Sequence, residues 1–250
     1  MASTPSTPRS TRALTSVQSP TSLQTELTPP PTPLHQLIKS GVMVKVSVGT
    51  EKETWLLHEG VICERSEWFN KAFMGGYMES DQKQIYLQDE EPEMFGHFVD
   101  WLYGKGLFCY KDHAKPSDIT FSHVREWLAL YIFADKIALK ALAQEALEQY
   151  NLCAEGTLPC TKEILLVYRN TMSGSPLRQS VVKTLMAEFF DQGEDDFDFI
   201  SDAIGCHPEF TRDISSALKS HTRLSTKKRE LASCSAHNKT PRVAGHKRKR

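Results

Sequence analysis

Four valines at every second position, Val42, Val44, Val46 and Val48, constrain the fold of this chain more than any other feature. Apolar residues at alternate positions lie on one face of a β-strand, so the pattern predicts a strand with one buried face. Gly49 ends the pattern, and residues 54–57 are typical of the antiparallel return strand. Two strands alone do not make a stable core, so the rest of the chain must cover their apolar face.

Helices and one further short strand are predicted after this hairpin. Ser66 is a favourable N-cap for the first helix, and residues 84–87 are predicted to form the short strand. Residues 93–103 carry the apolar stripe of an amphipathic helix, and the periodicity predicts two more helices within residues 124–137 and 139–150. Strands followed by a cluster of helices indicate the α+β class.

Residues 160–222 are predicted to form a helical extension. Ser175 is an N-cap with a proline at the first helical position, and Pro208 starts a second helix with apolar residues on one stripe. Such stripes need a surface on which to be buried. We expect them to pack against the preceding domain, and binding of a partner protein is the alternative.

Residues 1–36 consist mostly of Ser, Thr and Pro and are predicted to be disordered, because so few apolar residues cannot offset the entropy of ordering the backbone. Ser/Thr-Pro steps in this tail are candidate sites for a proline-directed kinase, and chance occurrence in a tail of this composition is the alternative. The candidate phosphorylation sites are Thr4, Thr7, Ser19, Thr28 and Thr32.

The net charge of −1 is the sum of three segments that differ in charge. Residues 1–40 carry +2, residues 41–218 carry −13 and residues 219–250 carry +10. The chain is therefore an acidic body with a basic tail, which we assign to residues 223–250 and expect to be disordered.

Two basic clusters in this tail are typical of a bipartite nuclear localisation signal that an importin would bind. Direct binding of nucleic acid is a weaker alternative, because no aromatic residues are interleaved with the charges and no folded DNA-binding motif is visible. A merely solvated tail, or one folded back on the acidic body, is the third interpretation. The residues of the two clusters are Lys227, Lys228 and Arg229, and Lys247, Arg248, Lys249 and Arg250.

The sequence predicts that this protein is not an enzyme and has no cofactor. The sequence contains no phosphate-binding loop, dinucleotide fingerprint or nucleophile elbow. Residues 89–91 are consecutive acids and favour a solvated turn, and His58 favours a structural, hydrogen-bonded role. Cys206-His207, and the pair Cys153 and Cys160, lack the spacing of a zinc site, so no metal site is predicted.

Six scattered cysteines and the absence of a secretory signal favour reduced thiols in a protein of the nucleus, the cytoplasm or both. No run of apolar residues is long enough to cross a bilayer, so no membrane association is predicted.

The order and spacing of several short segments within residues 40–150 resemble a BTB/POZ domain. Gly41-Val42-Met43 lacks the Asp that most metazoan members carry before the first strand, so the chain most resembles fungal proteins with a single N-terminal BTB domain. The segments that carry the resemblance are residues 44–49, 55–58, 61–62, 66–69, 72–73, 76–80, 85–87, 95–103 and 130–136.

This resemblance implies a three-stranded sheet capped by helices, a homodimer, and a scaffold for protein–protein contacts. Many members bind the cullin scaffold of a ubiquitin ligase, here through a surface near residues 95–103 and the following loop. We therefore expect an interaction scaffold that acts as a substrate adaptor for a cullin-based ligase. The alternative is a nuclear transcriptional or chromatin-associated regulator whose basic tail contacts nucleic acid.

Overall fold

The computed structural model describes residues 32–110, 121–155, 157–191 and 197–237. Within them lies a sheet of three strands in the order β2-β1-β3, namely β1 (Met43–Val48), β2 (Glu53–His58) and β3 (Gln84–Leu87). β1 pairs with β2 antiparallel, with Val46 opposite Trp55, and with β3 in parallel, with Val46 beside Ile85. The predicted hairpin and the short third strand are confirmed.

The alternation in β1 has the expected consequence for burial. Val44, Val46 and Val48 are each at most 1% exposed, whereas Met43 on the opposite face is exposed. Ser47 is also buried, and its hydroxyl is hydrogen-bonded to the Thr54 hydroxyl of β2 at 3.2 Å. One face of the hairpin therefore belongs to the core, as predicted for three of the four valines, whereas Val42 lies before β1 and is 42% exposed.

Four short helices precede or connect the strands: α1 (Leu34–Leu37), α2 (Glu59–Arg65), α3 (Glu67–Met74) and α4 (Met78–Gln82). α3 is the predicted helix, and Ser66 caps it by accepting a hydrogen bond from the backbone N–H of Phe69. The helices α2 to α4 lead the chain from β2 to β3, the crossover that lets β3 lie parallel to β1. The sequence pattern did not indicate α1, α2 or α4.

α1 begins inside the segment 1–36, for which the sequence predicts no structure. It packs against α2 at Gly60, where a Cβ atom would come within 2.6 Å of the Leu37 carbonyl oxygen. This close approach places the start of the folded chain slightly earlier than predicted.

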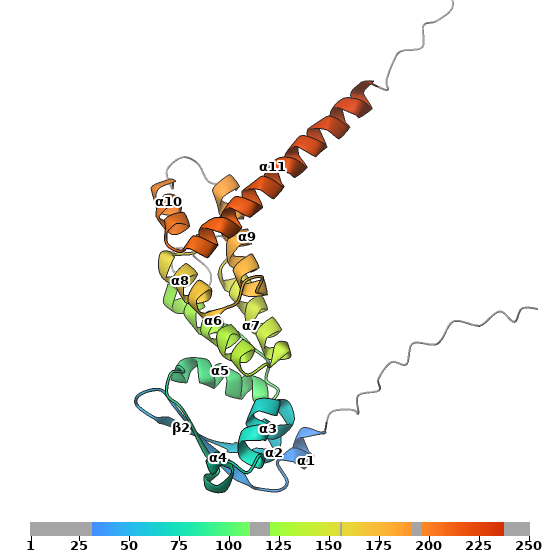
Figure 1. Ribbon diagram of the computed structural model, residues 1–250. Coiled ribbons are helices and arrows are strands. Elements are labelled where there is room, and N and C mark those ends of the chain that lie inside the picture. The colour runs from blue at the N-terminus through green and yellow to red at the C-terminus, as the bar shows by residue number, and fades with distance from the viewer. Residues whose placement is uncertain (1–31, 111–120, 156, 192–196, 238–250) are drawn as a thin grey trace, which may run out of the picture. The chain divides into compact units, whose positions relative to one another are not determined.

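Helix α5 (Pro92–Leu102) lies between the sheet and the pair α6 (Phe121–Lys136) and α7 (Lys140–Cys153), which pack side by side (Figure 1). Phe98 of α5 is fully buried, with its ring centroid 5.8 Å from that of Phe69 on α3 and 5.4 Å from that of Phe133 on α6. Aromatic side chains therefore join the sheet-covering helices to the α6–α7 pair in one core.

The C-terminal extension consists of α8 (Thr161–Asn170), α9 (Pro176–Asp191), α10 (Phe197–Gly205) and α11 (Pro208–His237). The striped residues Leu177, Val181 and Leu185 are at most 1% exposed. α8 contacts α6 and α9 contacts α7, so the extension packs against the preceding domain, as expected.

α11 continues to His237, past residue 222, where the sequence predicts the extension to end. The segment from Glu209 to His237 contains neither glycine nor proline, so nothing in it interrupts a helix. The remaining residues of the predicted basic tail, 238–250, lie outside the described residues. The predicted fold class, a three-stranded sheet capped by helices with further helices after it, is confirmed. Of the helices described, none has both the length and the apolar character needed to traverse a bilayer.

Candidate protein-interaction surface

Three adjoining hollows follow β3, an edge strand of the sheet. They have volumes of about 240, 330 and 360 Å³ and lie, in turn, beside α4, beside α3, and between the β3–α5 turn, α6 and α8. The first two share Ile85 and Tyr86, and the last two share Glu90 and Lys136. We call this continuous surface the β3 groove, formed by residues 84–91 and the facing residues of α3, α4, α6 and α8.

Large apolar side chains are exposed at the α3–α4 end of the β3 groove. Met74, Tyr77 and Met78 are 54%, 65% and 69% exposed. They flank a tight turn that requires glycine, since a Cβ at Gly75 would meet the Lys71 carbonyl oxygen at 2.2 Å and Gly76 has a φ of 74°. Clustered exposed apolar residues in a chain of this kind indicate a contact surface.

The floor of the groove is held in place by hydrogen bonds. The Tyr86 hydroxyl donates to the Gly49 carbonyl oxygen at 3.1 Å, which fixes a ring that is 40% exposed. Lys83, just before β3, donates to the Phe73 carbonyl oxygen at 3.0 Å and pairs with Glu59 at 2.6 Å. A surface fixed before binding loses less entropy when a partner docks.

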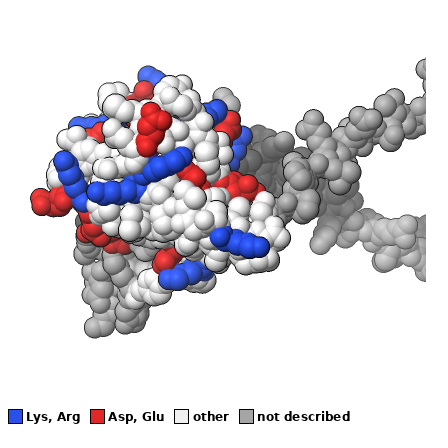
Figure 2. Space-filling view, turned by 90° about the horizontal axis from the view of Figure 1, so that it is seen from below, with Lys and Arg blue, Asp and Glu red and all other residues white. Residues whose placement is uncertain are grey.

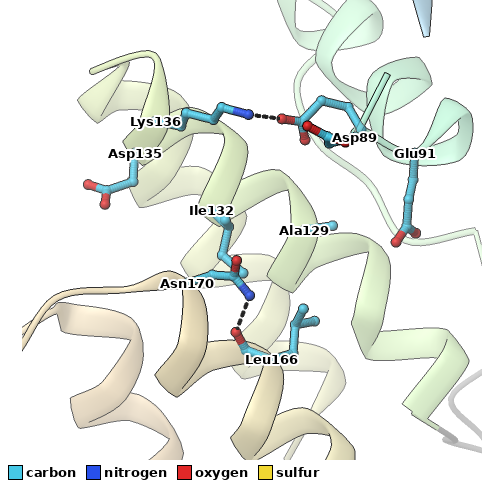
Figure 3. A pocket seen from close by; sticks show the side chains of 9 residues that line it. Asp89, Glu91, Ala129, Ile132, Asp135, Lys136, Leu166 and Asn170 are labelled. Carbon is cyan, nitrogen blue, oxygen red and sulfur yellow. Dashed lines mark hydrogen bonds and ion pairs between the residues drawn. The ribbon is translucent and has the colours of Figure 1, made fainter. Parts of the chain in front are cut away.

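The α6–α8 end of the groove has acidic and basic residues around a small apolar centre (Figure 3). Lys136 on α6 pairs with Glu90 of the β3–α5 turn at 2.7 Å, and Arg125 on α6 pairs with Glu91. Two of the three acids predicted to form a solvated turn therefore tie the turn to α6, and Asp89 lines the hollow.

Figure 2 shows the sheet end of the domain as a largely uncharged surface over which single Lys, Arg, Asp and Glu residues are dispersed. A second exposed apolar area lies on β1, β2 and the segment before them. Leu56 of β2 is 65% exposed, and Val42 and Met43 are 42% and 38% exposed. Because Leu56 pairs with Lys45 and Met43 pairs with His58, Leu56 and Met43 share the outer face of the hairpin.

The contact surface predicted near residues 95–103 and the following loop stays a prediction, because the loop exposes Phe108 and Tyr110 at 58% and 77% while the helix is partly buried. Within residues 95–103, Phe95, Phe98 and Leu102 are fully buried and Trp101 is 7% exposed, so these side chains form core rather than contact surface. His58 has the structural role predicted for it, since its backbone N–H and its Nδ1 lie 3.1 and 2.9 Å from the Tyr103 hydroxyl.

The predicted tail sites lie mostly outside the described part of the chain. Thr32 is described and exposed, while Thr4, Thr7, Ser19 and Thr28 are outside it. Residues 227–229 lie within α11, with side chains that are not described, and residues 247–250 are outside the described residues. The role of the two basic clusters therefore stays a prediction.

Two buried ionisable groups show what kind of chemistry the interior supports. Burial raises the pKa of the Cys63 thiol to about 11, so this cysteine stays protonated and is a poor nucleophile. Burial also raises the pKa of Glu163 to about 7, against the opposing effect of hydrogen bonds from the Tyr150 hydroxyl and the Cys160 backbone. Glu163 is 5% exposed and lies in the packing between α7 and α8, where it has a structural role.

Comparison with known proteins gives two findings. Residues 34–126 match the family described as the BTB/POZ domain, a span that runs from α1 into α6 and includes β3. Kelch-like protein 40b of Danio rerio is 30% identical over 74 residues, which are 30% of this chain and 12% of that protein. The chain therefore spans only a small part of the length of this relative.

Proposed function

We propose that this chain, which contains a BTB/POZ domain and so carries a protein-interaction module, is a substrate adaptor that binds a cullin scaffold through the β3 groove. Such a domain is typically a non-catalytic scaffold. The observation that carries the proposal is the exposure of Met78 and Tyr86, which line a hollow along an edge strand, next to the exposed Met74 and Tyr77 of the α3–α4 turn.

The groove has the composition of a protein-binding site. Interfaces are enriched in aromatic residues and Met at their centre and are polar at the rim. Here Tyr77, Met78 and Tyr86 lie at one end, and the ion-paired residues Glu90 and Lys136 lie farther along the groove. An amphipathic helix of a partner would bury its apolar face on the first group and place polar residues against the second.

Affinity purification of the tagged full chain from its native host, followed by mass spectrometry, tests this proposal. We expect the wild-type chain and Met172→Ala to recover a cullin in equal amounts. Met78→Ala should lower the amount of cullin recovered about tenfold or more. Met172 is a matched control, since it is 82% exposed and lies on the α8–α9 connection. Equal recovery with both variants, or the absence of cullins from the wild-type sample, would contradict the proposal.

Homodimer formation is proposed for the second apolar area, on the outer face of β1 and β2. Its support is the exposure of Leu56 and Met43 on adjoining strands, together with that of Val42 just before β1. Light scattering after size-exclusion chromatography of the full chain should give the mass of a dimer for the wild type and a monomer for Leu56→Glu. Leu152→Glu is the control, because Leu152 is 60% exposed on α7. A monomeric wild type at high concentration refutes this part.

The basic C-terminal segment is proposed to be an import signal bound by an importin, and the fungal single-BTB type stays a prediction from the sequence. The support is the charge of +10 carried by residues 219–250. Deletion of residues 247–250 from a tagged chain should lower the nuclear-to-cytoplasmic ratio, and an unchanged ratio would rule the signal out. Retention on DNA that is lost as salt is raised would instead favour the alternative of a nucleic-acid-associated regulator.

A further inference from the structure

Two thiols and one imidazole converge where α6 and α7 meet the segment after α5. Cys109 lies in that segment, His123 lies in the first turn of α6, and Cys153 is the last residue of α7. One possible ligand atom from each of the three residues lies within 4.8 Å of the other two. The Cys109 Sγ and the His123 Nε2 are 3.4 Å apart.

These distances fit a tetrahedral zinc site closely enough to test. Zinc bonds of about 2.3 Å to sulfur and about 2.0 Å to nitrogen put a sulfur and a nitrogen ligand about 3.5 Å apart, and two sulfurs about 3.8 Å apart. The distance between Cys109 and His123 has this value already. The widest separation, at most 4.8 Å, needs a contraction of about 1 Å, which side-chain rotation of a cysteine supplies.

The surroundings of the cluster also suit a metal with soft ligands. His123 is 4% exposed and Cys153 is fully buried, whereas Cys109 is half-buried and gives a route from solvent. Thiolate and imidazole favour Zn²⁺ over Mg²⁺ or Ca²⁺, which prefer oxygen ligands, and the cluster contains no carboxylate.

We infer that Cys109, His123 and Cys153 form a zinc site in which water is the fourth ligand. The two thiols lose their protons to solvent when Zn²⁺ binds, and the imidazole binds through a neutral nitrogen. The ion fastens the segment after α5 to α6 and to the end of α7. Residues 111–120, which join Cys109 to α6, lie outside the described residues and take no part in the inference.

Metal content and cobalt absorption of the full chain test the site. The wild-type chain purified in the presence of Zn²⁺ should hold one zinc per chain after gel filtration. Co²⁺ in its place should give the sulfur-to-cobalt charge-transfer band and the intense visible bands of a tetrahedral thiolate site. Cys109→Ser should weaken Zn²⁺ binding about 100-fold, the share of one ligand in a typical zinc affinity. Cys206→Ser, at a half-buried cysteine outside the cluster, should leave zinc content and spectrum unchanged.

A second readout keeps the inference testable if a variant folds poorly. Removal of zinc with a chelator should lower the melting temperature of the wild type and of Cys206→Ser, and should lower that of Cys109→Ser less. A wild-type chain without stoichiometric zinc, without the cobalt spectrum and with a melting temperature insensitive to chelator would overturn the inference. The three residues would then be a thiol–imidazole hydrogen-bonded cluster only.

Discussion

Replacement of Arg178 by Met should unfold the C-terminal extension more easily, because this buried guanidinium joins three helices. Arg178 of α9 is 4% exposed, and its Nε donates to the Thr171 hydroxyl at 3.0 Å. Its other nitrogens donate to the carbonyl oxygens of Tyr168 and Thr171 and pair with Glu209 of α11. The guanidinium also lies 4.4 Å from the centre of the Tyr168 ring.

The size of the effect depends on which hydrogen-bond partners of Arg178 are left buried, where no water can replace the lost donor. The Tyr168 and Thr171 carbonyl oxygens lose a charged donor in a buried place, and each such loss costs about 1–3 kcal/mol. The Glu209 side chain is 45% exposed and returns to solvent, so its share of the loss is small. Relief of the arginine's own desolvation offsets part of the sum. We expect a net loss of about 3 kcal/mol, or a melting temperature lower by about 6–12 °C for a chain of this size.

Urea denaturation of the full chain followed by circular dichroism measures this loss. Lys183→Ala is the matched control, because Lys183 lies exposed on the same helix and should change stability by no more than about 0.5 kcal/mol. Arg178→Lys should fall between the two, since an ammonium group cannot reach all the partners of the guanidinium fork. If Arg178→Met were as stable as Lys183→Ala, the reasoning from buried hydrogen bonds would be refuted.

Two further predictions concern single groups of the fold. Because the pKa of Glu163 is raised from 4.5 to about 7, the folded chain binds this proton more tightly than the unfolded chain, and stability falls as the pH rises through that interval. Glu163→Gln should therefore gain stability relative to the wild type between about pH 5 and about pH 8, by up to roughly 3 kcal/mol in urea denaturation, and no such gain would contradict the burial effect. Gly60→Ala should destabilise the chain by about 1–2 kcal/mol and loosen α1 in hydrogen exchange, because the added Cβ meets the Leu37 carbonyl. Gly96→Ala on α5 has open space and should instead stabilise by up to about 1 kcal/mol, so equal effects of the two alanines would refute the packing argument.

The strands and the longer helices could be predicted because their cause is local. The valines of β1 alternate, Ser66 caps α3, and residues 93–103 carry one apolar stripe. The signal for each of these elements therefore lies within its own residues. α2 and α4 were missed because helices of seven and five residues are too short to show a period. Their position depends on the crossover from β2 to β3, which is a property of the sheet.

The β3 groove and the cysteine–histidine cluster could not be located because both depend on tertiary packing. The apolar stripe of residues 95–103 does not reveal whether it faces the core or a partner, and the structure places it in the core. The exposed Met74, Tyr77 and Met78 had a weak signal, since apolar residues flank a Gly-Gly turn. Cys109, His123 and Cys153 come from three separate elements, so no local spacing motif could have found them.

Titration of the full chain with a purified cullin from the same organism, followed by isothermal calorimetry, tests the central claim most directly. The account predicts saturable binding of one cullin per chain, a Kd raised about tenfold or more by Tyr77→Ala, and no change with Met172→Ala. Tyr77 is 65% exposed, so its removal should leave the melting temperature nearly unchanged. Absence of binding heat with the wild-type chain, or an equal Kd for both variants, would contradict the claim that the β3 groove is the cullin-binding surface.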